Sequence, residues 1–139
     1  MGIKPIRYYQ IGIDLLQTGF GLMENHFVRI TETTSLDEME ARSKERPVVL
    51  FKHSLTCPIS ARAYDQMAEF PGEVALIEVQ RARELSSEIA TRLGVAHESP
   101  QVIVLRNGEV SWTASHFDIT ADAVAAAVRE TNGGKSQAD

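Results

Sequence analysis

Three short, mostly apolar runs constrain the fold of this chain more than any other feature of its sequence. They cover residues 48–51, 74–79 and 102–105. Runs of this length that lack polar alternation and are rich in β-branched residues are typical of strands buried on both faces of a sheet. The stretches between them have helical periodicity. This alternation predicts an α/β domain in which helices cover both faces of a mixed sheet.

The end signals of the predicted elements divide the chain further. Ser35 and Glu38 have the spacing of a capping box, and Thr120 is expected to cap the last helix. Gly94 stands where a left-handed residue ends a helix, and the Asn107–Gly108 pair predicts a hairpin turn. The expected order is strand 27–30, helix 36–44, strand 48–51, helix 58–70, strand 74–79, helix 83–93, strand 102–105, strand 110–113 and helix 120–130.

The length of 139 residues fits one domain, which we expect to span residues 23–132. Residues 133–139 form a polar tail, and residues 1–22 form an N-terminal extension, unless Met23 is the true start. Asp14 and Gln17 interrupt the apolar stretch of that extension, which argues against a signal peptide. A net charge of -5 argues against nucleic acid or an anionic membrane surface as a partner. No apolar run is long enough to span a membrane.

The chain has one cysteine, Cys57, so it cannot form an internal disulfide or a multi-cysteine metal site within one chain. A free thiol fits a reducing compartment such as the cytoplasm. Cys57 follows a predicted buried strand, and Pro58 occupies the first helical position, where its missing N–H has no cost. The unpaired N–H groups and the dipole of that helix then favour the thiolate, which is the form that attacks disulfides. Lys52 and Arg62 add positive charge nearby in the sequence.

The motif from Cys57 to Ser60 is C-x-x-S, and it lacks the second cysteine that would resolve a mixed disulfide. The Ser60 hydroxyl can donate a hydrogen bond to the thiolate, but an outside thiol has to complete an exchange reaction. Ile59, Ala63, Met67 and Phe70 fall on one face of the same helix, at spacings of 4, 4 and 3. The alternative for Cys57 is a small, inert, buried side chain, although its place at a helix start favours a reactive thiol.

The run at residues 51–60, F-K-H-S-L-T-C-P-I-S, resembles the monothiol bacilliredoxin family, and residues 27–131 resemble the thioredoxin superfamily. The resemblance implies a thioredoxin-like fold with Cys57 as nucleophile and Ser60 at the resolving position. It implies that Thr56 and Pro58 flank the sulfur. Ser99 and Pro100 lie where this superfamily has a cis-proline that lines the substrate groove.

The same resemblance implies a thiol–disulfide oxidoreductase with bacillithiol as co-substrate, without a bound cofactor or metal. Its partners would be S-bacillithiolated proteins of the cytoplasm. The residues themselves leave two alternative functions open. A monothiol thioredoxin fold can carry an iron–sulfur cluster between two chains, although Pro58 and Ile59 depart from the C-G-F-S pattern of such carriers. The chain could also be a redox-inert adaptor, for which an unreactive Cys57 would be the sign.

Overall fold

The computed structural model describes residues 26–130, and a five-stranded sheet organises this part of the chain. Its elements are β1 (Phe27–Arg29), α2 (Thr33–Arg42), β2 (Val48–His53), α3 (Pro58–Glu69), β3 (Val74–Glu78), α4 (Arg83–Leu93), β4 (Gln101–Arg106), β5 (Glu109–Ser115), the 3-10 turn η1 (His116–Asp118) and α5 (Ala121–Arg129). This order confirms the predicted alternation and the α/β class. The expectations for residues 1–22 and 133–139 lie outside the described residues.

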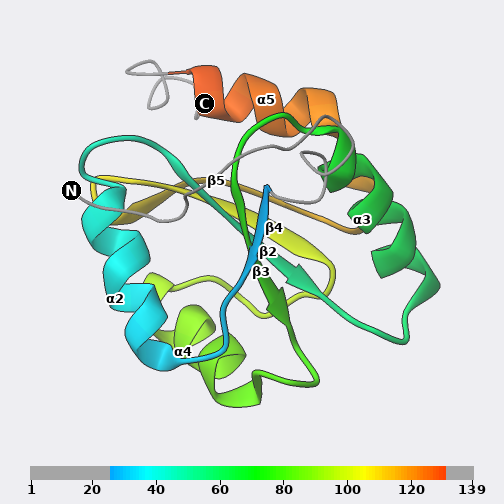
Figure 1. The fold of residues 1–139 in the computed structure, drawn as a ribbon, viewed down its shortest axis with the longest axis horizontal. Helices are drawn as coiled ribbons and strands as arrows, with labels where there is room; N and C mark the ends of the chain where they lie inside the picture. The colour runs from blue at the N-terminus through cyan, green and yellow to red at the C-terminus, as the bar shows by residue number, and fades with distance from the viewer. Residues whose placement is uncertain (1–25, 131–139) are drawn as a thin grey trace, which may run out of the picture.

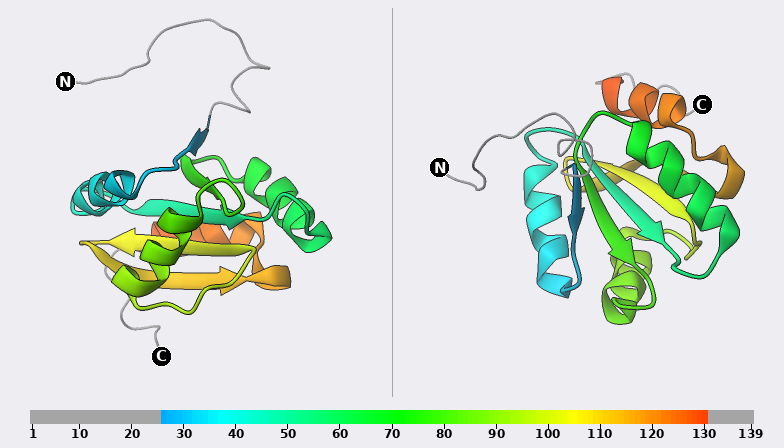
Figure 2. Two further views of the ribbon diagram at one scale, coloured as in Figure 1. Left: turned by 90° about the horizontal axis from the view of Figure 1, so that it is seen from below. Right: turned by 45° about the vertical axis from the view of Figure 1, so that its right-hand side comes forward.

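The strands lie in the order β1-β3-β2-β4-β5. The neighbours β1, β3 and β2 are parallel, whereas β4 is antiparallel to both β2 and β5. Figure 1 shows α2 and α4 on one side of this sheet and α3 and α5 on the other. Figure 2 shows the same sheet from two further directions, with β1 and β5 at its edges. The strand β2 is therefore central, and it leads directly to Cys57.

Side chains of successive strand residues enter two separate apolar clusters, because they point alternately to opposite faces of the sheet. Leu50 and Ile77 belong to the cluster with residues of α2 and α4. Phe51 and Leu76 belong to the cluster with residues of α3 and α5. The position of a residue on β2 thus decides which pair of helices its side chain faces. By the same alternation, Lys52 shares the side of Leu50, and His53 shares the side of Phe51.

Three of the predicted helix-end and turn signals are confirmed by the structure, and one helix start is not. Thr120 caps α5 by accepting a hydrogen bond from the Ala123 N–H at 3.1 Å. Gly94 has a φ of 70°, and the Asn107–Gly108 turn has φ values of 54° and 78°, so these predictions are confirmed. The predicted start of the first helix is wrong.

The helix α2 begins at Thr33, three residues earlier than expected, and its N-cap is Glu32 without a side-chain hydrogen bond. Ser35 lies inside the first turn, where its N–H donates to the Glu32 carbonyl at 2.9 Å. A capping hydrogen bond contributes about 1 kcal/mol, which is less than the burial of a side chain such as Leu36. Packing of Leu36 and Met39 against the sheet therefore outweighs the local capping signal. Among the described residues, no helix has the length and apolar character needed to span a membrane.

Candidate active site

Cys57 is the N-cap residue of α3, with an extended backbone at φ -101° and ψ 124°. Its carbonyl accepts a hydrogen bond from the Ala61 N–H at 3.1 Å, and Pro58 occupies the first helical position as predicted. The first turn of α3 contains no acidic residue, so no carboxylate there opposes the positive end of the helix dipole. The cysteine is partly exposed and has no disulfide partner. A thiol at this place can be reached by another sulfur.

Ser60 lies in the first turn of α3 and is fully buried. Its hydroxyl oxygen accepts a hydrogen bond from the Ser54 N–H at 3.1 Å. The contacts of the described residues include no hydrogen bond between this hydroxyl and the Cys57 sulfur, so donation to the thiolate stays a prediction. Ser60 thus fastens the start of α3 to the loop that precedes Cys57. Of the four apolar residues predicted to share one face of this helix, Ala63, Met67 and Phe70 are buried, whereas Ile59 is half-buried and Ser60 takes the inward position in the first turn.

Gln80 holds the loop before Cys57, and the sequence analysis missed it. Its side-chain carbonyl accepts from the Leu55 N–H at 2.9 Å. Its amide donates to the Ser54 hydroxyl at 2.9 Å and to the Thr56 hydroxyl at 3.4 Å. The sequence does hold one signal for Gln80, which is that it follows β3 just as the Cys57 loop follows β2. The carboxyl ends of adjacent parallel strands lie at the same edge of the sheet. Thr56 is thereby positioned beside Cys57 with an exposed side chain.

The Ser99–Pro100 peptide bond is cis, in agreement with the resemblance. Pro100 is buried and leads into β4, where Gln101 pairs with Lys52 of β2. The segment therefore lies at the end of the sheet from which the chain runs to Cys57. The Pro100 carbonyl accepts from the His116 N–H at 3.1 Å. The structure thus brings the predicted site residues to one end of the sheet, where Pro100 is hydrogen-bonded to the first residue of η1.

Lys52 and Arg62 occupy different surroundings. Lys52 is fully buried on the side of α2 and α4, and its Nζ has no hydrogen-bond partner among the described residues. Burial lowers the pKa of Lys52 to about 8, and the negative charge of Glu98 opposes that shift. Its charge is therefore on the face of the sheet that α3 does not cover. Arg62 is exposed on α3, and its guanidinium lies 5.4 Å from the centre of the Phe117 ring.

His53 faces α3 from the end of β2. Its ring centre lies 5.6 Å from that of Phe51 and 5.1 Å from that of Tyr64. Burial lowers the pKa of His53, and the charge of Glu78 opposes the shift. The imidazole is therefore held neutral by its apolar surroundings at neutral pH.

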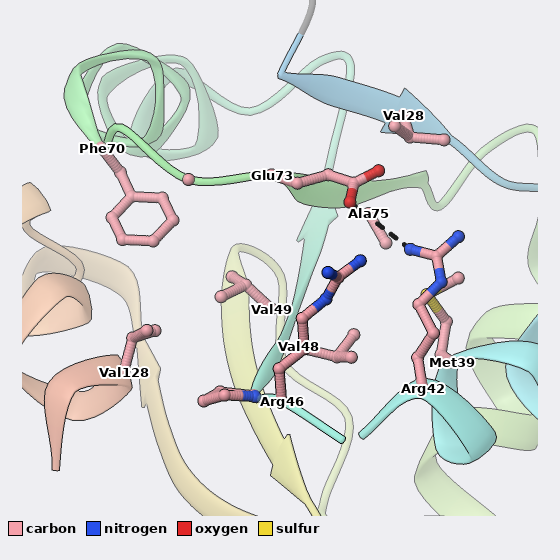
Figure 3. Close-up of a pocket in the computed structure, with 12 residues that line it drawn as sticks. Val28, Met39, Arg42, Arg46, Val48, Val49, Phe70, Glu73, Ala75 and Val128 are labelled. Carbon is pink, nitrogen blue, oxygen red and sulfur yellow. Dashed lines mark hydrogen bonds and ion pairs between the residues drawn. The ribbon is translucent and has the colours of Figure 1, made fainter. Parts of the chain in front are cut away.

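A groove of about 320 Å³, drawn in Figure 3, begins near Val48 at the start of β2, and the Cys57 loop follows the other end of that strand. Apolar residues such as Val28, Val48 and Phe70 line it, and an ion pair of 3.4 Å joins Arg42 to Glu73 at its edge. The groove begins where β2 starts, whereas Cys57 follows the end of β2. It is therefore separate from the cysteine site.

Known proteins share this architecture. A solved structure of a candidate oxidoreductase with a thioredoxin fold is 36% identical, with a TM-score of 0.67 over 76% of this chain and 96% of that one. Fasciola hepatica thioredoxin is 15% identical, with a TM-score of 0.56 over 73% of this chain and 95% of its own. Spinach chloroplast thioredoxin f is 21% identical, with a TM-score of 0.53 over 73% and 92%. The two thioredoxins support the fold alone.

The fold and the cysteine at the start of α3 place this protein among the thioredoxin-fold redox proteins. The monothiol bacilliredoxin BrxC family matches residues 28–124, which is more than half of the chain. The protein belongs to that family, as the resemblance of the run around Cys57 implied. The expected thioredoxin-like fold is confirmed as well.

Proposed function

We propose that this protein removes bacillithiol from mixed disulfides on proteins of the cytoplasm, with Cys57 as the nucleophile. The observation that carries the proposal is the place of the cysteine, partly exposed at the N-terminus of α3 with no acidic residue in the first turn. The unpaired N–H groups and the dipole of the helix stabilise a negative charge at this point. A thiolate is the reactive species in disulfide exchange.

The reaction consists of two thiol–disulfide exchanges. In the first, the Cys57 thiolate attacks the bacillithiol sulfur of the mixed disulfide, a new disulfide forms, and the client thiolate leaves and takes a proton from water. In the second, the thiolate of another bacillithiol attacks the disulfide on Cys57. This step releases oxidised bacillithiol and returns the Cys57 thiolate. The client cysteine is reduced, and two bacillithiol molecules become one disulfide.

The second step requires an outside thiol because Ser60 stands where a resolving cysteine would be. A serine side chain has no sulfur and cannot form a disulfide, and the Ser60 hydroxyl is buried and accepts a hydrogen bond from the Ser54 N–H. Around the sulfur, the client protein is proposed to contact Thr56, Pro58, Ser99 and Pro100. They support the proposal because they lie at the same end of the sheet as Cys57, with Thr56 and Pro58 exposed.

Intact-mass spectrometry tests the proposal directly. The full chain is incubated with a bacillithiolated test protein, and we expect a mass increase of one bacillithiol on Cys57 together with release of the free test protein. Addition of reduced bacillithiol should then remove the adduct. The control Cys57→Ser should gain no mass, because a serine hydroxyl does not exchange with disulfides.

Two results would contradict the proposal. The first is an unmodified Cys57 under conditions in which a small disulfide reagent does modify it, which would favour another thiol partner. The second is a Cys57 that no disulfide modifies, which would favour a redox-inert adaptor.

A further inference from the structure

Phe117 is the most exposed large apolar side chain of the described residues, with 61% of its surface accessible. It lies in η1, which packs against α3, the helix that begins at Cys57 (Figure 2). A single exposed apolar side chain is ordinary on a protein surface, so what matters is how this one is held and where it lies. Leu55, two residues before Cys57, is also exposed, at 42%. Apolar surface is thus available on both the loop before the cysteine and η1.

The backbone holds Phe117 in place instead of leaving it on a loose loop. The preceding residue, His116, has a φ of 55°, which is uncommon for a residue other than glycine. Its N–H donates to the Pro100 carbonyl at 3.1 Å, and its ring lies 3.7 Å from the Glu98 carboxylate. The Ile119 N–H closes the turn on the His116 carbonyl at 3.2 Å. Unfavourable backbone conformations of this kind tend to persist where they serve a function.

Contacts with α3 hold the ring and the following segment. The Arg62 guanidinium lies 5.4 Å from the ring centre, within the range of a cation–π interaction. Arg62 is four residues after Pro58, so the two share a face of α3. On the other side of η1, the Ala121 N–H donates to the Gln66 side chain at 2.9 Å. Phe117 is therefore a fixed, exposed aromatic ring that is tied both to the segment at Pro100 and to α3.

We infer that Phe117 recognises the client protein by contacting an apolar side chain in the extended segment that carries the mixed disulfide. The inference rests on the proposed function, and it assigns the preference among clients to a residue outside the C-P-I-S motif. The occupant is a polypeptide because the turn that carries the ring is hydrogen-bonded to the Pro100 carbonyl, in the segment along which the proposed function would place the client backbone. A small disulfide needs access to the sulfur alone. Phe117 thus acts in the first exchange and not in the second.

The test compares Phe117→Ala with the unchanged protein on three substrates. Two are bacillithiolated test proteins whose single cysteine lies in an extended segment, flanked by leucines in one and by serines in the other. The third is oxidised bacillithiol. We expect the variant to lose about tenfold in kcat/KM on the leucine-flanked protein, since aromatic anchors contribute at this level. Its rates on the serine-flanked protein and on oxidised bacillithiol should stay within about twofold.

Two further variants complete the experiment. Val28→Ala removes an exposed apolar side chain on β1 that lines the distant groove, so it should change no rate. Phe117→Trp should keep the preference for the leucine-flanked protein. Equal losses on all three substrates, or an unchanged preference in Phe117→Ala, would overturn the inference and leave the proposed function standing. Absence of any adduct on the unchanged protein would instead overturn the proposed function itself.

Discussion

Lys52 is a charged residue in the interior, on the strand that leads to the cysteine. It is fully buried, and its pKa is lowered to about 8 because burial disfavours the charged amine. The negative charge of Glu98 opposes this lowering of the Lys52 pKa. Burial also lowers the pKa of the nearby His97, and the positive charge of Lys52 lowers it further. In the unfolded chain the Lys52 amine returns to its ordinary pKa near 10.5. The unfolded chain therefore binds more protons than the folded protein between about pH 8 and pH 10.5.

Replacing Lys52 with methionine should stabilise the protein at pH 7. The buried charge destabilises the folded state fully below about pH 8, and this effect disappears as the pH rises toward 10.5. The shift corresponds to about 3 kcal/mol in the free energy of unfolding. Urea unfolding should therefore show Lys52→Met more stable at pH 7 by about this amount, with a smaller difference at pH 9.5. The control Lys44→Met replaces an exposed lysine and should change stability by less than about 0.5 kcal/mol. A difference that is constant with pH would contradict the assignment.

At the scale of one element, α5 depends on contacts at its first turn. The helix has nine residues, which is too short for stability in isolation. The Thr120 hydroxyl accepts from the Ala123 N–H, and the Gln66 side chain accepts from the Ala121 N–H. Val124 and Ala127 bury its inner face in the cluster shared with α3. Each of these contacts offsets part of the entropy lost when the helix forms.

Thr120→Ala should lower the free energy of unfolding by about 1 kcal/mol, because the Ala123 N–H loses its side-chain acceptor. Amide hydrogen exchange in the first turn of α5 should become faster, and the change in rate should correspond to a similar loss of free energy. Thr120→Ser is the matched control, since it keeps the hydroxyl oxygen and should cost only a few tenths of a kcal/mol. If serine and alanine destabilise the protein equally, the capping hydrogen bond is not the source of the effect.

At the scale of the whole molecule, the sheet separates the apolar interior into two clusters. Ile77 on β3 lies in the cluster of α2 and α4, and Val104 on β4 lies in the cluster of α3 and α5. The strand β2 lies between β3 and β4, so two strand spacings and opposite faces separate these residues. Neither side chain shares a cluster with the other. Their contributions to stability should therefore be independent.

The double variant Ile77→Val with Val104→Ala tests this independence. Each single change removes buried methyl groups and should cost about 0.5 to 2 kcal/mol in the free energy of unfolding. The cost of the double variant should equal the sum of the two within about 0.5 kcal/mol. Urea unfolding of the four proteins measures the difference. A coupling above 1 kcal/mol would show that β2 transmits packing changes between the two clusters.

The sequence alone determined the features that depend on neighbouring residues. The short continuous apolar runs indicated the strands, because runs of this length are typical of strands that are buried on both faces of a sheet. Pro58 indicated the start of the helix at Cys57, since proline fits the first helical position without loss of a hydrogen bond. The Asn107–Gly108 pair and Gly94 indicated backbone turns that require a positive φ. The run around Cys57 also indicated the family.

Only the tertiary structure decided which distant residues meet. Gln80 contacts the loop before Cys57 because β3 lies beside β2, and no local pattern shows that pairing. Strand alternation places Lys52 on the face away from α3, although it is close to Cys57 in sequence. Phe117 is exposed beside α3 because the Pro100 carbonyl holds the turn before it. Local signals act through backbone preferences of about 1 kcal/mol, whereas burial and strand pairing join residues far apart in sequence and outweigh those preferences, as the early start of α2 shows.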